Sequence, residues 1–202
     1  MRPKLDHELI YQTALPFFAR YGYKKTTLED IAGALGMSNT NLYSYAKSKR
    51  DLYDGCVSYA IDQWQEYVRQ CCKGIDDPLD KLKETFRSAV TYLATHEDTQ
   101  ALLRNDPAIF PMFPSIDPIE EYNDWSVNWA TDIVKEGVEQ GIFRAENVAE
   151  VGEMLFNFYK FFIISTLEST QDEETLATRM KVFTDLAFYG LVTDEARQRS
   201  ED

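Results

Sequence analysis

The chain has 202 residues, of which 44% are hydrophobic and 27% are charged, and its formal net charge is −13. This composition excludes wholesale disorder and is enough for one large domain or two smaller domains that share an interface. No uninterrupted apolar run is long enough to span a bilayer, and Asp6 and Glu8 stand where a secretory signal would be apolar. The sequence therefore predicts a cytoplasmic protein that does not enter a membrane.

The charge is divided unevenly along the chain. Residues 1–55 hold eight Lys or Arg against six Asp or Glu, a net charge of +2, whereas the remaining residues hold 13 against 28, a net charge of −15. Only the N-terminal quarter can approach DNA favourably, and the acidic remainder should face away from it. This division suits a dimeric repressor with a small basic head better than a protein that coats nucleic acid nonspecifically.

Residues 5–21 are predicted to form the first helix, because apolar side chains recur along them at helical spacing and Gly22 follows as a stop. Pro16 interrupts this pattern. Proline removes a backbone donor and clashes with the carbonyl four residues earlier, which costs about 3 kcal/mol inside a helix. We therefore expect the helix either to bend between Gln12 and Pro16 or to break into two pieces.

The stretch 26–45 has the pattern of two short helices joined by a tight turn. Thr27 can cap the first helix, and Asp30, three residues later, completes a capping box. Gly36 stands where the helix must end in a left-handed conformation, and Ser38 can cap the next helix at once. This is the pattern of a helix-turn-helix, whose second helix usually enters the major groove of DNA. The same pattern also occurs as an ordinary helical corner in proteins that never touch DNA.

Polar side chains around the second of these helices favour the DNA-binding interpretation. Small polar groups suit base edges, and an asparagine can bond adenine with two hydrogen bonds. Tyrosine and lysine can reach phosphates, and such contacts position a protein on the duplex. The candidate base-reading residues are Asn39, Thr40, Asn41 and Ser44, and the candidate phosphate-contacting residues are Tyr43, Tyr45, Lys47 and Lys49.

The segment 14–52 carries several short motifs in a fixed order. These are Gly22-Tyr23, Thr26-Thr27-Leu28-Glu29-Asp30-Ile31-Ala32, Leu35-Gly36-Met37-Ser38, Leu42-Tyr43-Ser44-Tyr45 and Lys47-Ser48-Lys49-Arg50-Asp51-Leu52. In this order the segment resembles the DNA-binding domain of the TetR family of one-component transcriptional regulators. The remainder of the chain agrees with that family only in length and helical layout.

The resemblance implies an all-α protein with a three-helix helix-turn-helix head, residues 1–50, followed by a larger helical body for ligand binding and dimerisation, residues 51–202. It also implies that Lys49 anchors a phosphate near the N-terminus of the helix after the head, where the helix dipole also favours anions. The roles that it implies are phosphate contacts for Thr27 and Lys49, base contacts for Asn39, Thr40 and Asn41, and backbone or thymine contacts for Tyr43 and Tyr45.

Four positions depart from the common pattern of that family. Thr40, Asn41 and Ser44 replace residues that are frequent in the DNA-reading helix, so this protein should read an operator of its own. Ala46 replaces a frequent phenylalanine that packs the head together. The head should therefore be either looser or packed differently.

The rest of the chain is predicted to form further helices, because apolar residues recur at helical spacing between Gly, Pro or Asp breaks. The expected ranges are 49–73, 78–96, 98–105, 118–140, 147–168 and 173–192. The helix 147–168 is apolar on nearly all sides, so one face should meet the core of the body and the other a partner subunit. Together with the small residues of 173–192, this predicts a homodimer formed through the last two long helices.

A proline-rich segment and a set of aromatic residues indicate a ligand site in the body. Residues 106–118 contain four prolines but are too apolar for a solvated linker, so they form either a flap over a cavity or plain packing. The aromatic residues either bind a small apolar or aromatic effector or are simple core. The candidate ligand-binding residues are Phe110, Phe113, Trp125, Trp129, Phe158, Tyr159 and Phe162.

No catalytic, metal or cofactor motif stands out in the sequence. His7 and His96 lie far apart without ligand spacing, and no glycine loop suits a phosphate. Cys56, Cys71 and Cys72 make no disulfide framework. The adjacent pair is either a thiol or soft-metal sensor or reduced structural cysteine, and the frequency of buried cysteine favours the latter. We therefore expect neither an enzyme nor a cofactor.

The residues as a whole predict a ligand-responsive DNA-binding regulator. In this prediction a homodimeric repressor releases a palindromic operator when a small effector fills the body. Two alternatives stay open: a ligand-independent dimeric DNA-binding protein, and a small all-α enzyme that uses the aromatic residues.

Overall fold

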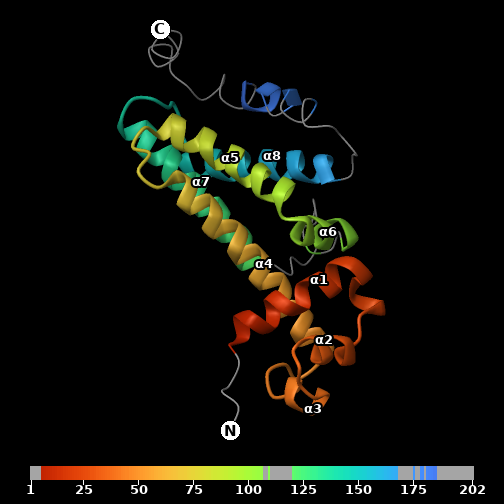
Figure 1. Cartoon of the computed structure of the whole chain (residues 1–202). Coiled ribbons are helices and arrows are strands. Elements are labelled where there is room, and N and C mark those ends of the chain that lie inside the picture. Colours follow the sequence, from red (N-terminus) through yellow and green to blue (C-terminus); the bar gives the residue numbers. More distant parts are fainter. Residues whose placement is uncertain are drawn as a thin grey trace. The chain divides into compact units, whose positions relative to one another are not determined.

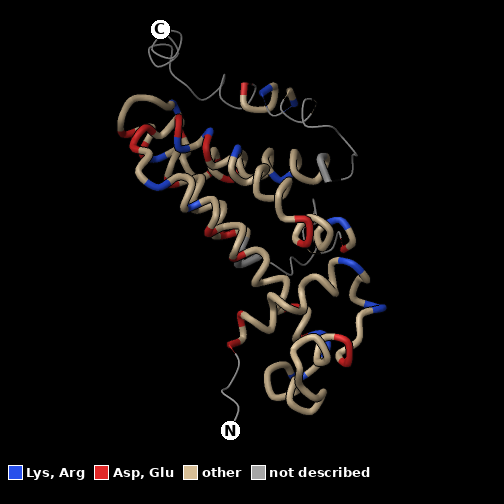
Figure 2. The backbone as a smooth tube through the Cα atoms, in the orientation of Figure 1, with Lys and Arg blue, Asp and Glu red and all other residues tan. Residues whose placement is uncertain are grey.

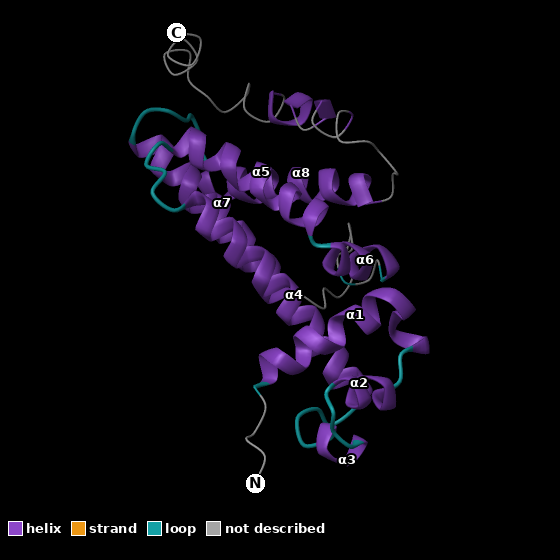
Figure 3. Cartoon of the chain, viewed as in Figure 1, coloured by secondary structure: helices purple, strands orange, loops and turns teal. Residues whose placement is uncertain are grey.

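The computed structural model describes residues 6–106, 109, 120–167, 175, 178–179 and 181–185, and the side chains of all of these except 120–122 and 166–167. Within them every long element is a helix, which confirms the all-α prediction (Figures 1 and 3). The helices are α1 (His7–Lys25), α2 (Leu28–Ala34), α3 (Asn39–Leu42), α4 (Lys49–Cys72), α5 (Pro78–Thr95), α6 (Glu97–Asn105), α7 (Glu120–Glu139) and α8 (Val148–Leu167). Phe110, Phe113, most of the predicted flap and most of the predicted helix 173–192 lie outside the described residues.

The chain is organised as two compact units that are interleaved along the sequence. One unit contains Met1–Glu66 and Tyr92–Phe110, and the other contains Tyr67–Thr91 and Pro111–Asp202. α4 and α5 therefore each contribute to both units. The predicted domain boundary at residue 50 stays a prediction. We refer to α1, α2, α3 and the first turns of α4 as the head, and to α7, α8 and the part of α5 up to Thr91 as the body.

The break in α1 lies at a glycine rather than at its proline. Pro16 lies inside the helix, whereas the non-helical backbone dihedrals belong to Gly22, at φ 73° and ψ 165°. Glycine reaches this conformation because it has no Cβ. Pro16 and Gln12 are both exposed, so the Gln12 carbonyl that loses its helical partner can face water. Of the two outcomes expected at Pro16, the break is wrong, and the backbone instead leaves the helical conformation at Gly22, the predicted stop.

The head has a small apolar core, and α6 packs against α1. The fully buried side chains of the head include Ile10, Phe18, Ile31, Leu42 and Leu52. At the end of α6, the Asn105 side-chain amide donates to the Ala19 carbonyl of α1 at 2.7 Å. The Tyr53 hydroxyl of α4 donates to the Asp106 carboxylate at 2.6 Å. These two bonds fasten the C-terminus of α6 to two different helices.

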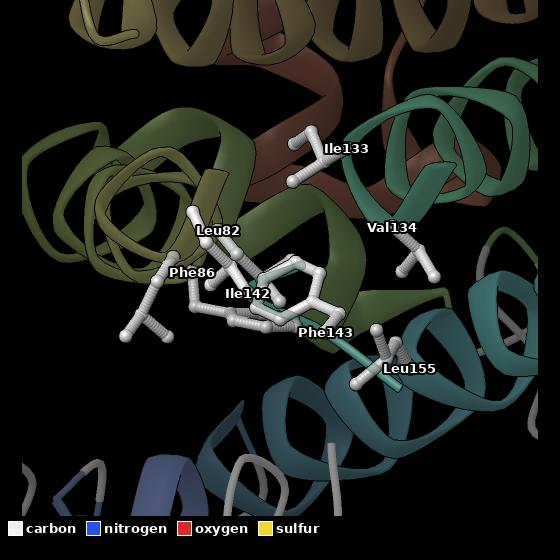
Figure 4. Close-up of a cluster of buried hydrophobic side chains, with 8 residues drawn as sticks. Leu82, Phe86, Ile133, Val134, Ile142, Phe143 and Leu155 are labelled. Atoms are coloured by element: carbon white, nitrogen blue, oxygen red, sulfur yellow. The ribbon is translucent and has the colours of Figure 1, made fainter. Parts of the chain in front are cut away.

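A cluster of aliphatic and aromatic side chains forms the core of the body (Figure 4). Its buried members are Leu79, Leu82, Phe86, Ile133, Val134, Ile142, Phe143 and Leu155. α5, α7, α8 and the turn after α7 all contribute. α7 and α8 approach closely because Gly152 has no side chain: a Cβ there would lie 2.1 Å from Thr131 Oγ1. Each fully buried Leu or Phe contributes about 1.5–3 kcal/mol, so apolar packing is the main force that joins these helices.

α8 has one buried face and one exposed apolar face. Phe162 and Ile163 are buried, whereas Met154, Phe158 and Phe161 are 43%, 56% and 60% exposed. The exposed three recur at spacings of four and three residues and so share one face of the helix. This agrees with the prediction that a single chain covers only one side of this helix. None of the described helices combines the length and the apolar character needed to cross a membrane.

Candidate nucleic-acid interface

The first helix of the helix-turn-helix, α2, begins with a side-chain cap. The Thr27 hydroxyl accepts a hydrogen bond from the Asp30 backbone N–H at 3.2 Å and donates one to the Asp30 carboxylate at 2.5 Å. The cap satisfies a backbone donor that the first turn would otherwise leave unpaired. The predicted cap by Thr27 is confirmed, but the reciprocal half of the capping box is not formed, because the Asp30 carboxylate accepts from the Thr27 hydroxyl and not from the Thr27 backbone N–H. Because that proton is already donated, a phosphate contact by the Thr27 hydroxyl would require it to turn away from Asp30.

The turn after α2 is closed by Gly36, and the next helix starts almost at once. Gly36 has φ 63°, a left-handed conformation that costs a residue with a Cβ about 1–2 kcal/mol. The Met37 N–H donates to the Ala32 carbonyl at 2.9 Å, which closes the end of α2. The Ser38 hydroxyl then accepts a bond from the Asn41 N–H at 3.3 Å and so caps α3. The predicted positions of both caps and of the turn are confirmed.

α3 is a single turn of helix anchored by one buried side chain. Leu42 is 1% exposed and holds α3 to the core of the head. The side chains of Thr40, Asn41, Tyr43 and Ser44 are exposed, and Tyr43 is 53% exposed. The Ser44 hydroxyl donates to the Asn41 carbonyl at 2.6 Å, which closes the turn after α3. Four of the predicted DNA-contacting side chains are therefore accessible from outside the head.

Asn39, the first predicted base reader, is turned partly inward. Its side chain is half-buried, and its Oδ1 atom is buried without a hydrogen-bond partner. A buried polar atom without a partner costs about 1–3 kcal/mol, so this arrangement is unfavourable in the free protein. Asn41, by contrast, is exposed. Of these two predicted base readers, only Asn41 has an exposed side chain.

Tyr45 is half-buried and contacts a histidine from the start of α1. The His7 ring centre lies 5.6 Å from that of Tyr45 in an edge-on arrangement, and 6.0 Å from that of Tyr11. Such tilted pairs are favourable for aromatic rings. His7 therefore joins the first residue of α1 to the segment after α3. The sequence holds no signal for this contact, because only the folding of the head brings the two positions together.

The two predicted phosphate-binding lysines at the start of α4 are placed differently. The Lys49 ammonium donates to the Lys24 carbonyl at 3.2 Å and lies 4.7 Å from the centre of the Tyr23 ring. The Lys47 backbone N–H donates to the Asp51 carboxylate at 2.7 Å, and the side chain of Lys47 is exposed. Lys49 thus ties the start of α4 to the end of α1. Lys47 is the more available of the two to a phosphate.

Two small residues let the head close tightly. Ala46 is buried, and its N–H donates to the Leu42 carbonyl at 3.1 Å. Gly55 in α4 lies so close to Tyr11 that a Cβ there would be 2.4 Å from a ring atom. Of the two outcomes expected for Ala46, a looser head or a repacked one, its burial supports the repacked head.

The charge around α3 comes from its flanks. The stretch 31–46 contains no charged residue, and Figure 2 shows it without a charged segment. An uncharged segment with lysines on both sides suits base contacts in the middle and phosphate contacts at the sides, although Glu29 and Asp30 directly precede it. The basic residues of the flanks are Lys24 and Lys25 before the stretch and Lys47, Lys49 and Arg50 after it.

In the body, the predicted ligand-binding residues fall into two groups. The first is a stacked pair on α7: the Trp125 and Trp129 ring centres lie 5.5 Å apart, and the Arg69 guanidinium lies 5.0 Å from the centre of the Trp125 ring. The Trp129 indole N–H donates to the Thr85 hydroxyl at 3.1 Å, so its polar atom is satisfied within the protein. Both tryptophans are half-buried.

The second group joins α8 to α5 and to residue 183. The Tyr159 ring centre lies 5.3 Å from that of Phe86, and the Phe162 ring centre lies 5.1 Å from that of Phe183. Phe86 and Phe183 were not predicted as members of this group. The sequence could place each of them on a helix, but it could not show that they contact Tyr159 and Phe162. Phe158 does not join this group within one chain, because it lies on the exposed face of α8. Trp129 and Tyr159 both border the core cluster of the body.

The cysteines behave as packed thiols. Cys56 and Cys72 are buried, Cys71 is half-buried, and all three are free. Burial raises the pKa of the Cys56 thiol well above its ordinary value, and it also raises the pKa of Cys72. Both thiols are therefore protonated near neutral pH, and a thiol is much less reactive than a thiolate. Among the described residues, no group of His, Cys, Asp and Glu could hold a metal ion. The burial of Cys72 favours a structural role.

Comparison with known proteins identifies relatives of this chain. Residues 10–56 match the family model described as bacterial regulatory proteins, tetR family. The HTH-type transcriptional repressor KstR2 of Mycolicibacterium smegmatis is 28% identical over 146 residues, which are 72% of this chain and 71% of that protein. This relative is named as a repressor of transcription and not as an enzyme.

Solved structures share the fold along nearly the whole chain. The ketosteroid transcriptional regulator KstR2 of Mycobacterium tuberculosis has a TM-score of 0.62 at 18% identity, covering 95% of this chain and 98% of that one. AibR was solved in complex with isovaleryl coenzyme A and operator DNA. Its TM-score is 0.62 at 16% identity, and the match covers 89% of this chain and 96% of AibR. At these identities the likeness establishes the fold: a helix-turn-helix followed by a helical body.

Proposed function

The chain belongs to the TetR family of transcriptional regulators, and on this premise we propose that it is a repressor that releases a palindromic operator when a small effector binds its body. The observation that carries the proposal is the capped helix-turn-helix that exposes Thr40, Asn41 and Ser44 on an uncharged segment. Because a regulator of this kind acts on the chromosome, the proposal includes a cytoplasmic location.

The exposed side chains of α3 suit the reading of bases in the major groove. Asn41 can pair with the N6 and N7 atoms of adenine, and the methyl group of Thr40 can contact a thymine methyl. A good bidentate contact discriminates against the wrong base by about 1–3 kcal/mol. Tyr43 and Lys47 can reach phosphates, and such contacts set the position of the head on the duplex without reading its sequence.

The exposed apolar face of α8 supports a homodimer. Met154, Phe158 and Phe161 would leave contact with water if a second copy packed against this face, and their burial would be favourable. The predicted helix 173–192 is the other candidate part of this interface. Two heads held by such a dimer would read two half-sites whose centres lie about 34–36 Å apart, or a multiple of that distance.

The aromatic groups of the body support a small apolar or aromatic effector. Trp125 and Trp129 present half-buried ring surface, and Tyr159 and Phe162 lie on the buried side of α8. Of the solved structures with the same fold, KstR2 is a ketosteroid transcriptional regulator and AibR was solved in complex with isovaleryl coenzyme A. An effector releases the operator only if it binds the non-DNA-binding geometry more tightly, because it can shift the equilibrium only by its differential affinity.

A mobility-shift titration with DNA from upstream of the protein's own gene tests this proposal. The probes added as effectors are isovaleryl coenzyme A and a 3-ketosteroid, with a scrambled DNA of equal length as the control. We expect the upstream DNA to shift at a lower protein concentration than the scrambled DNA, and one effector to reverse the shift. No preference for any DNA would contradict the regulator, and a shift that no compound alters would favour a ligand-independent DNA-binding protein.

A further inference from the structure

One hydroxyl in the body is buried without a hydrogen-bond partner. Among the described residues, two buried side-chain polar atoms lack a partner: Oδ1 of Asn39 and the hydroxyl oxygen of Tyr159. Asn39 belongs to the DNA-reading segment and Tyr159 to the aromatic group of the body. Buried polar atoms in native proteins are almost always paired, so each exception calls for an explanation. In both places, a ligand that binds the protein could supply the partner.

Other hydroxyl and indole donors of the body are paired within the protein. The Trp129 indole N–H donates to the Thr85 hydroxyl, which itself donates to the Lys81 carbonyl at 2.9 Å. The Ser88 hydroxyl of α5 donates to the Glu84 carbonyl at 2.6 Å. These three donors are therefore satisfied by the backbone and side chains of the body itself. The unpaired Tyr159 hydroxyl stands out against them.

The surroundings of Tyr159 keep its hydroxyl protonated. The centre of its ring lies 5.3 Å from the centre of the Phe86 ring, and the side chain borders the apolar cluster of the body. Burial raises the pKa of the Tyr159 phenol well above its ordinary value of 10.0. The group is therefore a neutral hydrogen-bond donor at any physiological pH. A donor in apolar surroundings selects a ligand that brings an acceptor.

We propose that the Tyr159 hydroxyl donates a hydrogen bond to an oxygen acceptor of the effector, which is an apolar molecule that carries an uncharged carbonyl group. A carbonyl oxygen accepts without a proton of its own, so it complements the proton that the neutral phenol has to donate. A carboxylate would also accept, but its charge is expensive to bury among apolar rings. This inference rests on the proposed effector site in the body and names the chemical group that the effector must carry there.

The first test needs no effector and compares two Tyr→Phe variants of the full chain. Tyr159→Phe removes a hydroxyl without a partner, whereas Tyr53→Phe removes one that donates to Asp106 at 2.6 Å. In urea titrations at one protein concentration, we expect the unfolding midpoint of Tyr159→Phe to equal or exceed that of the unmodified protein. The midpoint of Tyr53→Phe should fall. A clear fall for Tyr159→Phe would show that its hydroxyl has a partner in the free protein and would overturn the inference.

The second test uses two probes of similar shape, 2-acetylnaphthalene and 2-ethylnaphthalene, which differ in one carbonyl oxygen. Calorimetry on the unmodified protein should give a dissociation constant about tenfold lower for the acetyl compound, the size of one hydrogen bond to a previously unpaired donor. In Tyr159→Phe the ratio should fall to about one, while the affinity for the ethyl compound is retained.

The outcomes separate this inference from the function on which it rests. A preference for the acetyl compound that survives in Tyr159→Phe would overturn the role of the hydroxyl and leave the apolar site intact. Binding of neither compound to the unmodified protein would contradict the apolar effector site itself, and the inference would fall with it. Loss of the preference with retained binding of the ethyl compound is the result that supports both.

Discussion

In the head, short helices begin and end at side chains that pair with the nearby backbone, whereas in the body long helices share one apolar cluster. Thr27 and Ser38 cap α2 and α3, and Gly36 closes the turn between them. The body has the buried cluster around Leu82 and the close approach of α7 and α8 at Gly152. The ends of the short helices in the head are therefore determined mainly by local sequence, whereas the helices of the body are joined by contacts between residues that are far apart. Substitutions should act differently in the two regions.

The largest expected effect is the loss of core packing in the body. Leu82 is fully buried, so Leu82→Ala should lower the free energy of unfolding by about 2–5 kcal/mol through lost burial and the cavity left behind. The matched control is Leu9→Ala in α1, where the side chain is 43% exposed and the cost should stay below about 1 kcal/mol. Urea unfolding at a fixed protein concentration measures both. Equal costs for the two would contradict the assignment of body stability to this cluster.

Two glycines of the head sharpen the claim that local backbone geometry decides its stability. Gly36 has φ 63°, so Gly36→Ala should destabilise the protein by about 1–2 kcal/mol although there is open space around its Cα. Gly33 lies inside α2, again with open space, so Gly33→Ala should stabilise it by about 0.5–1 kcal/mol. The measurement is the thermal unfolding midpoint of each variant. Shifts of the same sign would contradict the local account.

The cap of α2 offers a smaller test that separates stability from DNA reading. Thr27→Ala removes the oxygen that pairs with the Asp30 N–H and should cost about 1 kcal/mol. Thr40→Ala, on exposed α3, should change stability by less than about 0.5 kcal/mol. Only Thr40→Ala should alter which operator sequence is preferred, as measured by binding to a set of single-base operator variants. A stability loss for Thr40→Ala as large as that for Thr27→Ala would contradict the assignment.

The smallest effect at neutral pH concerns Cys56 and becomes visible only in alkali. In the folded protein, burial raises the pKa of the Cys56 thiol above its ordinary value of 9.0. Below pH 9 the thiol is therefore protonated in both the folded and the unfolded protein, and it does not change the free energy of unfolding. As pH rises above 9, the thiol ionises in the unfolded state alone and stability falls, by at most about 1.4 kcal/mol per pH unit. Cys56→Ala should therefore lose less stability than the unmodified protein between pH 9 and pH 10. If the free energy of unfolding fell equally with pH in Cys56→Ala and in the unmodified protein, the burial of this thiol would be contradicted.

The contrast between the two regions also explains what could be predicted from the sequence. The caps at Thr27 and Ser38 and the turn at Gly36 were within reach because each depends on residues no more than three or four positions apart. The helix ranges were also close, since apolar spacing marks a helix wherever it packs. Pro16 does not break the helix, because an exposed proline can leave the unpaired carbonyl of Gln12 in water, whereas the non-helical backbone lies at Gly22, the predicted stop.

What could not be predicted depends on folding at long range. The bond from Tyr53 to Asp106 joins residues that no spacing rule connects, and so does the contact of His7 with Tyr45. The exposure of Phe158 beside the buried Phe162 depends on which face of an all-apolar helix meets the core. Periodicity does not reveal that face when every side of the helix is apolar. The unpaired oxygen of Asn39 is likewise invisible in the sequence.

The most direct test of the central claim, that the exposed segment of α3 reads an operator, is the binding of three proteins to upstream and scrambled DNA over a range of salt. The unmodified protein, Asn41→Ala and Lys47→Ala are compared. We expect Asn41→Ala to lose about tenfold in discrimination between the two DNAs with its salt dependence unchanged, because it removes a base contact. Lys47→Ala should weaken binding to both DNAs equally and lower the salt slope by about one. Full discrimination by Asn41→Ala, with its preference among bases intact, would contradict the account.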